Sequence, residues 1–164
     1  MEKTQTKNAA GLRRCIYSAV VLLVIALDQL TKYLVVQNFF YGESKPLIDG
    51  VVHLTYVTNS GAAFGMLKDH RWVFMVLSTA AILGIYACLW IFAKRSPLFC
   101  TGLAMIVGGG IGNMIDRIVL GYVVDFVDFT LIHFAVFNVA DSFVSVGAVM
   151  LVIWFVRSMI LEYR

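Results

Sequence analysis

Residues 98–120 read LFCTGLAMIVGGGIGNMIDRIVL, and this stretch decides the fold class. It is apolar over most of its length and close to the ~20 residues that a helix needs to cross the hydrocarbon core of a membrane. Three similar stretches occur at about 15–36, 72–93 and 137–160. The sequence therefore predicts an all-α membrane bundle of four transmembrane helices, which forms one domain over residues 1–164.

The overall composition excludes an ordinary soluble domain. Hydrophobic residues make up 60% of the chain and charged residues only 14%, whereas a soluble domain carries about 45–50% apolar residues. An excess of this size needs lipid to cover it. The net charge of +3 is small. Because the basic residues occur in short clusters at the ends of the apolar stretches, they indicate membrane topology and no nucleic-acid partner.

Lysine and arginine residues predict the orientation in the membrane. With four crossings, the amino terminus, the link between the second and third stretches, and the tail lie on one side. The basic residues of these three places are Lys3, Lys7, Arg13, Arg14, Lys94, Arg95, Arg157 and Arg164. Cytoplasmic loops carry an excess of Lys and Arg. We therefore expect both termini in the cytoplasm and two outer loops, at about 37–71 and 121–136.

The larger outer loop contains a segment that favours β structure. Residues 51–58 read VVHLTYVT, which is rich in β-branched residues and is flanked by turn-forming residues at Gly50 and Asn59. Such a pattern predicts a short strand or a hairpin. The smaller outer loop contains several phenylalanines, which suit the membrane–water interface.

Polar and ionisable residues gather near the outer ends of the apolar stretches. Such residues are costly at membrane depth, so each one is a functional hypothesis by default. Two pairs are spaced four apart, which places each pair on one face of a helix. The group consists of Asp28, Lys32, Asn113, Asp116, Arg117, Asp125, Asn138 and Asp141. Scattered structural polar residues would have no reason to agree on one depth.

The carboxylates of this group best fit a hydrolytic reaction. Two close aspartates cannot both ionise comfortably, so one of them keeps a proton. The ionised one can take a proton from water as the water attacks a carbonyl group, and the protonated one can polarise that carbonyl and later protonate the leaving amine. Asp125 and Asp141 stand at adjoining ends of consecutive helices and suit this chemistry. On spacing alone, Asp116 or Asp128 could replace Asp125, and the sequence does not say which aspartate holds the proton.

Other catalytic chemistries find little support. The three histidines, His53, His70 and His133, form no His-Glu-x-x-His motif, so zinc hydrolysis is poorly supported. No Gly-x-Ser-x-Gly motif stands near a suitable base, which argues against a serine nucleophile. We therefore expect no metal ion and no cofactor.

Each feature also has a non-catalytic interpretation. The polar group could seal a helix bundle, belong to a scaffold, or conduct protons in a small transporter, although the shared depth and the lack of an inverted repeat argue against transport. Asp28 and Lys32 could simply neutralise each other, and Arg117 could bind a lipid phosphate. The glycines within residues 108–112 suggest close helix packing or room for a substrate backbone. Asn59 is by itself a turn residue.

Five motifs make the chain resemble lipoprotein signal peptidase, the type II signal peptidase of bacteria. They occur in that family's order and cover essentially the whole chain. The motifs are DQLTK at 28–32, NSGAAF at 59–64, GGGIGNMIDR at 108–117, VVDF at 123–126 and FNVADS at 137–142. No motif position departs from the family pattern, and the stretch between Asp125 and Asp141 is slightly short for the family.

The resemblance implies an aspartyl endopeptidase that cleaves the signal peptide from diacylglyceryl-modified prolipoproteins just before the lipidated cysteine. By the same resemblance, Asp125 and Asp141 are the catalytic pair and Asp116 is structural. The residues that match supporting positions are Asp28, Lys32, Asn59, Asn113, Arg117 and Asn138. The resemblance also implies a small extracytoplasmic β-cradle and a place in the bacterial cytoplasmic (inner) membrane, with the active site near the outer leaflet. We expect prolipoprotein substrates and membrane lipid as partners, and we expect the protein to be a monomer.

Overall fold

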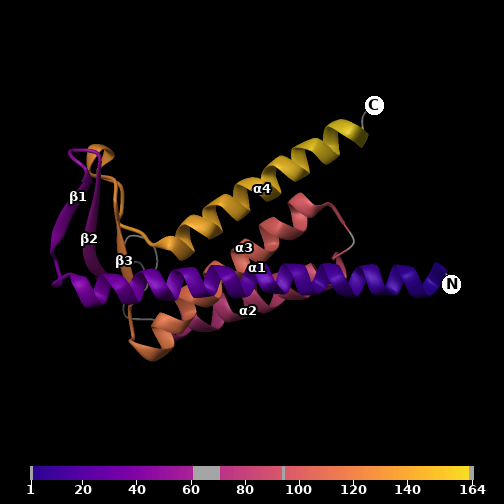
Figure 1. Cartoon of the computed structure of the whole chain (residues 1–164), viewed down its shortest axis with the longest axis horizontal. Coiled ribbons are helices and arrows are strands. Elements are labelled where there is room, and N and C mark those ends of the chain that lie inside the picture. The colour runs from indigo at the N-terminus through magenta and orange to yellow at the C-terminus, as the bar shows by residue number, and fades with distance from the viewer. Residues whose placement is uncertain (1, 61–70, 94, 163–164) are drawn as a thin grey trace.

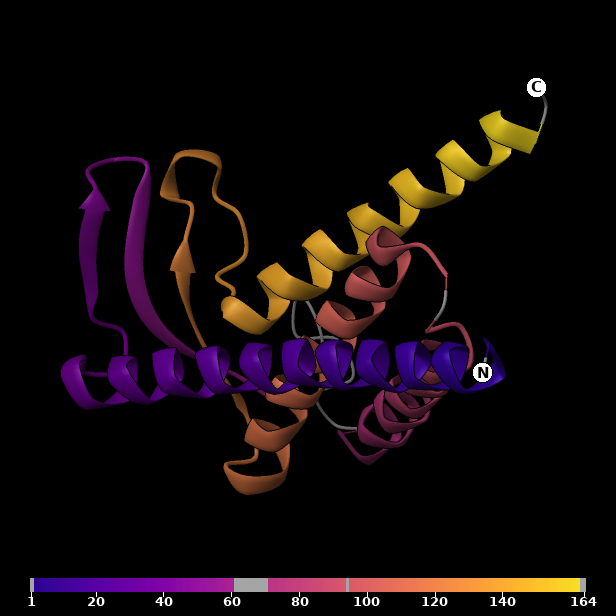
Figure 2. The ribbon, with the colours of Figure 1, turned by 45° about the vertical axis from the view of Figure 1, so that its right-hand side comes forward.

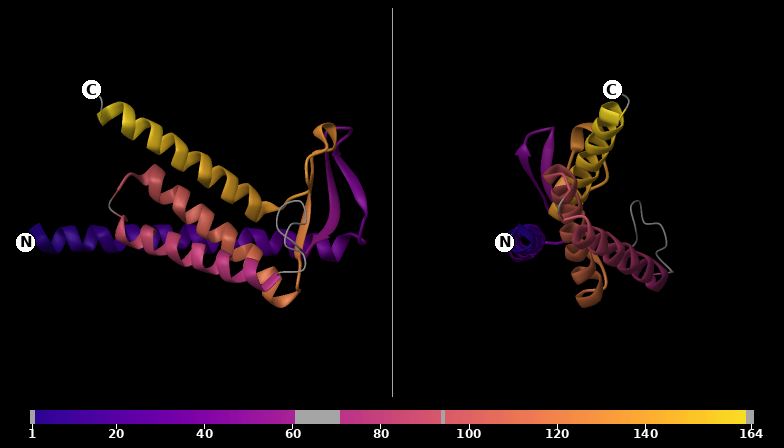
Figure 3. Two further views of the ribbon diagram at one scale, coloured as in Figure 1. Left: turned by 180° about the vertical axis from the view of Figure 1, so that it is seen from behind. Right: turned by 90° about the vertical axis from the view of Figure 1, so that its right-hand side faces the viewer.

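The computed structural model describes residues 2–60, 71–93 and 95–162, so residues 61–64 of the second motif and His70 lie outside the described part. In chain order the elements are α1 (Glu2–Asn38), β1 (Ser44–Ile48), β2 (Val52–Asn59), α2 (Arg71–Ile91), α3 (Pro97–Val119), β3 (Val123–Asp128), the 3-10 helix η3 (Thr130–Ile132) and α4 (Val139–Glu162). The strands lie at one end of the helix bundle and both chain termini at the other (Figures 1 and 3). We call these the sheet end and the terminal end.

Three helices in the described part of the chain are long and apolar enough to cross a membrane. They are residues Gly11–Asn38 of α1 and the whole of α3 and α4. In α2 the described apolar segment, Met75–Ile91, is shorter. The expected membrane bundle is therefore confirmed as a mainly helical chain with three candidate spans, and the fourth crossing, by α2, stays a prediction.

The predicted boundaries of the second and third helices agree with α2 and α3 within about two residues, which is the usual uncertainty of a helix end. The first helix is longer than predicted and begins at Glu2, because apolar character marks only the part of a helix that suits lipid. The last helix begins at Val139, later than predicted. Phe137 instead forms a β-bridge with Val127, so its backbone is extended.

Helix α3 is the centre of the bundle, since it packs against each of the other three helices. Its glycines make this possible. A Cβ atom on Gly108 would collide with Val24 of α1, and one on Gly109 would collide with the backbone of Ala140 in α4. One on Gly110 would press on α2. The glycine-rich motif thus allows close helix approach on three sides, as the sequence predicted.

Away from the sheet, the helices are joined by apolar packing. One buried cluster contains side chains from α1, α2 and α3, namely Tyr17, Val21, Leu89, Cys100, Leu103, Ala104 and Val107. Helix α4 packs mainly on α3 and diverges from α1 toward its carboxyl end (Figure 2).

The three strands form one antiparallel sheet in the order β1-β2-β3. Strand β2 confirms the strand predicted at 51–58, and the small sheet agrees with the expected β-cradle. Strand β3 lies in the smaller outer loop, where the sequence pattern predicts no strand. Val124 and Phe126 of β3 pack on Val35 of α1. This contact fixes the sheet against the end of the first helix.

Candidate active site

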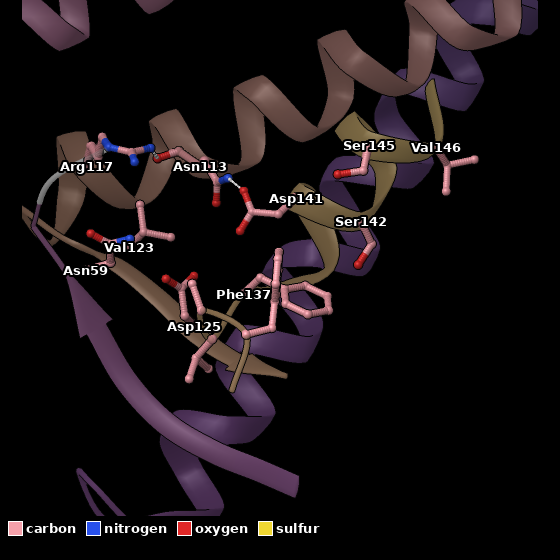
Figure 4. A pocket seen from close by; sticks show the side chains of 13 residues that line it. Asn59, Asn113, Arg117, Val123, Asp125, Phe137, Asp141, Ser142, Ser145 and Val146 are labelled. Carbon is pink, nitrogen blue, oxygen red and sulfur yellow. Dashed lines mark hydrogen bonds between the residues drawn. The ribbon is translucent and has the colours of Figure 1, made fainter. Parts of the chain in front are cut away.

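A pocket of about 470 Å³ lies where α3, β3 and α4 meet at the sheet end. Its lining residues come from β2, α3, β3, the loop before α4, and α4. They are Asn59, Asn113, Arg117, Val123, Asp125, Phe134, Ala135, Val136, Phe137, Asp141, Ser142, Ser145 and Val146. Figure 4 shows Asp125 and Asp141 pointing toward the same space from different elements. The pocket therefore contains both aspartates that the sequence singled out.

Asp125 is placed by the end of α3 and by the alternation of β3. Gly121 follows the helix with a φ of 91°, a left-handed conformation that glycine adopts without strain. Its N–H donates to the Asp116 carbonyl at 3.2 Å, and the chain then enters β3. Successive side chains of a strand point to opposite faces. Because Val124 and Phe126 face the apolar cluster, Asp125 faces the pocket.

Asp141 is placed by the cap of α4. A helix begins with N–H groups that have no partner within the helix. Asn138 caps α4, and its side-chain oxygen accepts the Asp141 N–H at 3.0 Å. In return, Asp141 Oδ2 accepts the Asn138 N–H at 3.2 Å. This reciprocal pair is a capping box, and it holds the Asp141 carboxylate at the first turn of the helix.

The side-chain amide of Asn138 also joins the two aspartates. Its Nδ2 atom lies 2.6 Å from Asp125 Oδ1 and 3.0 Å from Asn113 Oδ1. The residue is completely buried, with 0% of its surface exposed, so its hydrogen bonds are protected from water. Asn138 therefore binds the Asp125 carboxyl group through its side-chain amide and the Asp141 carboxyl group through its backbone N–H.

Asn113 of α3 holds the opposite side of Asp141. Its Nδ2 donates to Asp141 Oδ1 at 2.8 Å (Figure 4), and its own Oδ1 accepts from Lys32 Nζ at 2.8 Å. The lysine can only donate, so it fixes which way the Asn113 amide is turned. Arg117, one turn further along α3, donates to the Asn113 carbonyl at 3.1 Å and lines the pocket.

Burial and neighbouring charge act together on Asp125. Only 3% of this residue is exposed, and removal from water disfavours a charged carboxylate. Burial first, and then the negative charge of Asp141, raise the pKa of Asp125 to about 6. Hydrogen bonds from Asn138 and Asn59 and the positive charge of Lys32 oppose this rise. A pKa raised in this way is a property that catalytic acids often have.

The other predicted site residues fall into two groups. Asn59, Asn113 and Arg117 line the pocket with the two aspartates. Asp28 and Lys32 lie behind it, buried to 0% and 3% exposure and paired at 2.9 Å. The expectation that these two charges neutralise each other is therefore met in part, because Lys32 also reaches Asn113 in the pocket wall.

The two alternatives to Asp125 take different places. Asp116 turns away from the pocket, and its Oδ2 accepts the Val124 N–H at 3.1 Å. Asp128 accepts a hydrogen bond from Thr55 at 2.9 Å, on the neighbouring strand. Within the described residues, Asp125 is the aspartate that shares a pocket with Asp141.

Some residues of the site were not found from the sequence. Ser142 and Ser145 line the pocket beside Asp141, and the helical spacing of four from Asp141 would have indicated Ser145. Gln29 lies behind the pocket and donates to Asp116 Oδ1 at 2.9 Å. The sequence feature that could have indicated Gln29 is an amide side chain inside an apolar stretch. In the described part of the chain, no group of three His, Cys, Asp or Glu side chains is arranged to hold a metal ion.

Comparison with known proteins gives consistent matches over most of the chain. A sequence model of the family described as Signal peptidase (SPase) II matches residues 20–157. The lipoprotein signal peptidase of Brevibacillus brevis is 47% identical over 131 residues, which is 80% of this chain and 88% of the relative. That of Halalkalibacterium halodurans is also 47% identical, over 145 residues, covering 87% of this chain and 92% of the relative.

Solved structures also resemble the fold. A bacterial membrane enzyme determined by the in meso method at 2.3 Å resolution superposes with a TM-score of 0.76 and 27% identity, covering 88% of this chain and 89% of that chain. A second solved structure of a bacterial membrane enzyme, at 1.9 Å resolution, gives a TM-score of 0.71 and 27% identity, covering 85% of this chain and 92% of that chain. The arrangement of helices and sheet is therefore shared with membrane enzymes.

Proposed function

Because the chain belongs to the signal peptidase II family, we propose that it cleaves the signal peptide from prolipoproteins and that Asp125 and Asp141 activate the attacking water. Membership of this family confirms the resemblance that the sequence motifs indicated, and it implies that the protein is a peptidase. One observation carries the proposed mechanism. The two aspartates come from different elements, line one pocket, and are joined through Asn138.

The surroundings of the two carboxyl groups support different roles for them. Asp141 accepts an N–H donor on each oxygen, from Asn113 and from the Asn138 backbone. It also lies at the amino end of α4, where the helix dipole favours negative charge. Asp125 is more deeply buried, and its pKa is raised to about 6. We therefore assign the charge to Asp141 and the proton to Asp125.

The reaction then follows with one proton shared by the pair. Asp141 takes a proton from water as the water oxygen bonds to the carbonyl carbon of the scissile peptide. Asp125 donates a hydrogen bond to the carbonyl oxygen, which stabilises the charge that develops there. The C–N bond breaks when the proton of Asp125 passes to the leaving amine. The proton on Asp141 returns to Asp125 and restores the starting state.

The pocket wall also suits a substrate with an acyl group. Phe134, Val136, Phe137 and Val146 give one side of the pocket an apolar surface, and the ring of Phe137 packs against Phe129 and Phe134. A diacylglyceryl group beside the scissile bond would hold that bond at membrane depth, since each buried methylene contributes ~0.8 kcal/mol. We propose that the lipid is part of what the site recognises, and that cleavage occurs just before the lipidated cysteine.

We place the sheet end at the outer leaflet of the bacterial cytoplasmic membrane, with both termini in the cytoplasm and the protein acting as a monomer. The positive-inside rule supports this orientation, and both termini lie at one end of the bundle. The test is cysteine labelling from outside intact cells at Ser44→Cys and at Leu131→Cys, in a chain whose three cysteines are replaced by serine. A site that labels only after lysis would contradict the orientation.

The proposed mechanism is tested with purified protein and a diacylglyceryl prolipoprotein in detergent. Asp125→Asn and Asp141→Asn should each lower kcat by about 10⁴-fold, and the double variant should lose little more, because the pair acts as a unit. A chelator should leave the rate unchanged, since two carboxyl groups can activate water without a metal. Activity that is lost on chelation and restored by one added metal would point to a metallopeptidase.

Asp128→Asn is the matched control, because Asp128 lies on the same strand as Asp125 but bonds to Thr55 outside the pocket. It should keep near-normal turnover. If Asp125→Asn is as active as Asp128→Asn, the assignment of the pair is wrong. The lipid is tested separately, with one prolipoprotein supplied with and without its diacylglyceryl group. Equal cleavage of the two forms would show that the site does not recognise the lipid, and it would not contradict the aspartyl mechanism.

A further inference from the structure

Lys32 is a buried cation that contacts three polar side chains behind the pocket. Its Nζ atom lies 2.9 Å from Asp28 Oδ2, 3.0 Å from Asp116 Oδ2 and 2.8 Å from Asn113 Oδ1. An ammonium group has three donors, so the three acceptors use all of them. The residue is only 3% exposed. The lysine therefore has one well-defined position, set by two helices.

The two carboxylates that Lys32 joins each hold a backbone N–H group beside the catalytic pair. Asp28 Oδ1 accepts the N–H of Ala140 at 3.0 Å, and Ala140 immediately precedes Asp141. Asp116 Oδ2 accepts the N–H of Val124 at 3.1 Å, and Val124 immediately precedes Asp125. Each catalytic aspartate is thus tied, through its neighbour in the chain, to a carboxylate that contacts Lys32.

The third contact of Lys32 reaches the pair through a side chain. Asn113 accepts from Lys32 and donates to Asp141 Oδ1 at 2.8 Å. Gln29 adds a neutral bridge, since its Nε2 donates to Asp28 Oδ2 at 3.2 Å and to Asp116 Oδ1 at 2.9 Å. Without the lysine, two buried carboxylates would face each other with no cation between them. Like charges in a buried site repel strongly, and the backbones that they hold would separate.

We propose that Lys32 is a positioning residue that sets the separation and orientation of Asp125 and Asp141 by joining the two carboxylates that hold their backbones. This inference rests on the proposed function of the pair. Lys32 does not line the pocket, so it acts on catalysis through other residues. A substrate-binding role would raise KM, whereas a positioning role lowers kcat.

The experiment compares Lys32→Met with Lys45→Met in detergent, using the diacylglyceryl prolipoprotein. Methionine keeps much of the length of lysine and removes its charge. Lys45 is the matched control, because its ion pair with Glu43 is at the surface, with 54% of the lysine side chain exposed. Misplacement by ~1 Å can cost about 10²-fold in rate. We expect Lys32→Met to lower kcat by about 10²-fold with KM within about 2-fold, and Lys45→Met to be unchanged.

A pH–rate profile separates positioning from a loss of folded protein. The charged groups near the pair in the described chain are Asp28 and Lys32 from α1 and Asp116 and Arg117 from α3. The positive charge of Lys32 lowers the pKa of Asp125, so its removal disfavours ionisation of that carboxyl group. The alkaline limb of the profile, where Asp125 loses the proton that it donates, should therefore move to higher pH in Lys32→Met and stay in place in Lys45→Met. A smaller amount of correctly folded enzyme would lower the rate without moving the limb.

A second variant keeps the inference testable if Lys32→Met does not fold. Lys32→Met with Asp116→Asn leaves the formal charge of the cluster at minus one, as in the natural protein, because one cation and one anion are removed together. The asparagine oxygen can still accept the Val124 N–H. The same loss of kcat is expected. A folded variant of either kind with kcat within about 3-fold of the natural protein would overturn the inference, and so would a loss of kcat in Lys32→Met with an unmoved alkaline limb.

The outcomes also distinguish this inference from the proposed function. If Asp125→Asn is inactive while Lys32→Met has a normal kcat and pH profile, only the positioning role of Lys32 is wrong. If Asp125→Asn is active, the pair is wrong and the inference falls with it.

Discussion

The terminal end and the sheet end of the helix bundle are held together in different ways. At the terminal end, α1, α2 and α3 meet through apolar side chains such as Tyr17, Leu89 and Leu103. At the sheet end, the helices meet through buried polar groups, among them Asp28 and Asn138, which are both 0% exposed. The hydrophobic effect has no preferred direction, whereas a hydrogen bond weakens steeply as its geometry departs from ideal. Geometry is thus most tightly specified at the end that contains the pocket.

Close approach of the helices is common to both ends, but its consequence differs. Near the terminal end, a Cβ on Gly102 of α3 would lie 2.9 Å from the Gly147 carbonyl of α4, so only packing would be disturbed. At the sheet end, a Cβ on Gly112 would lie 2.5 Å from the Asp28 carboxylate. The same kind of substitution should therefore damage stability at one end and both stability and catalysis at the other.

The largest effect in this comparison is expected at Asn138. Asn138→Ser keeps an oxygen that can cap α4 but removes the amide that donates to Asp125 at 2.6 Å. Loss of one such donor typically costs about 10²-fold in kcat, and we expect a loss of that size with a nearly normal thermal midpoint. Asn38→Ser is the control, because the Asn38 amide bonds to an exposed helix carbonyl. Equal rates for the two variants would show that the amide is not used in catalysis.

Gly112→Ala should come next. The added methyl group presses on Asp28, and strain from overpacking costs typically 1–3 kcal/mol. We expect a lower thermal midpoint and a lower kcat per folded molecule. Gly84→Ala in α2 is the control, since a Cβ there has open space and alanine is favoured over glycine in a helix by about 0.5–1 kcal/mol. A normal kcat for Gly112→Ala would mean that the polar network tolerates the displacement.

The terminal end should respond in stability alone. Leu103→Ala leaves a cavity in the apolar cluster, and changes of this kind cost about 2–5 kcal/mol in water-soluble proteins. We expect a value near the lower limit, ~2 kcal/mol, because apolar side chains gain little from leaving lipid. The kcat per folded molecule should not change. Leu23→Ala, at a leucine that is 58% exposed, should have a smaller effect. A loss of kcat in Leu103→Ala would show that the two ends are coupled.

The smallest expected effect is a gain of stability at the site itself. The pKa of Asp125 is raised from 3.8 to about 6 in the folded protein. The contribution of its proton to the free energy of unfolding is therefore fully present below about pH 4 and is lost as the pH rises through 6. Asp125→Asn avoids that loss. Its thermal midpoint should exceed that of the natural protein above pH 6 by about 2–4 °C, and the difference should close below pH 4. A constant difference at all pH values would contradict this linkage.

The sequence alone determined the membrane class and most helix positions of this protein, because apolar length and composition report on the solvent that a segment can enter. It also indicated the polar group near the outer ends of the apolar stretches. The spacing of Asp28 and Lys32, and of Asn113 and Arg117, placed each pair on one helix face. The strand β2 followed from its β-branched residues. Each of these features is local, so a short window of the chain contains the information.

Only the tertiary structure chose among the aspartates and revealed how they are held. By spacing alone, the sequence does not distinguish Asp116, Asp125 and Asp128. Strand β3 had no recognisable alternation of polar and apolar residues, because apolar residues occupy both faces of the strand. The bond from Asp28 to the Ala140 N–H spans 112 residues of sequence. Contacts of this length depend on how α1, α3 and α4 pack together, which no local window of sequence encodes. The joining, through Lys32, of the two chain segments that carry Asp125 and Asp141 is therefore a property of the folded chain.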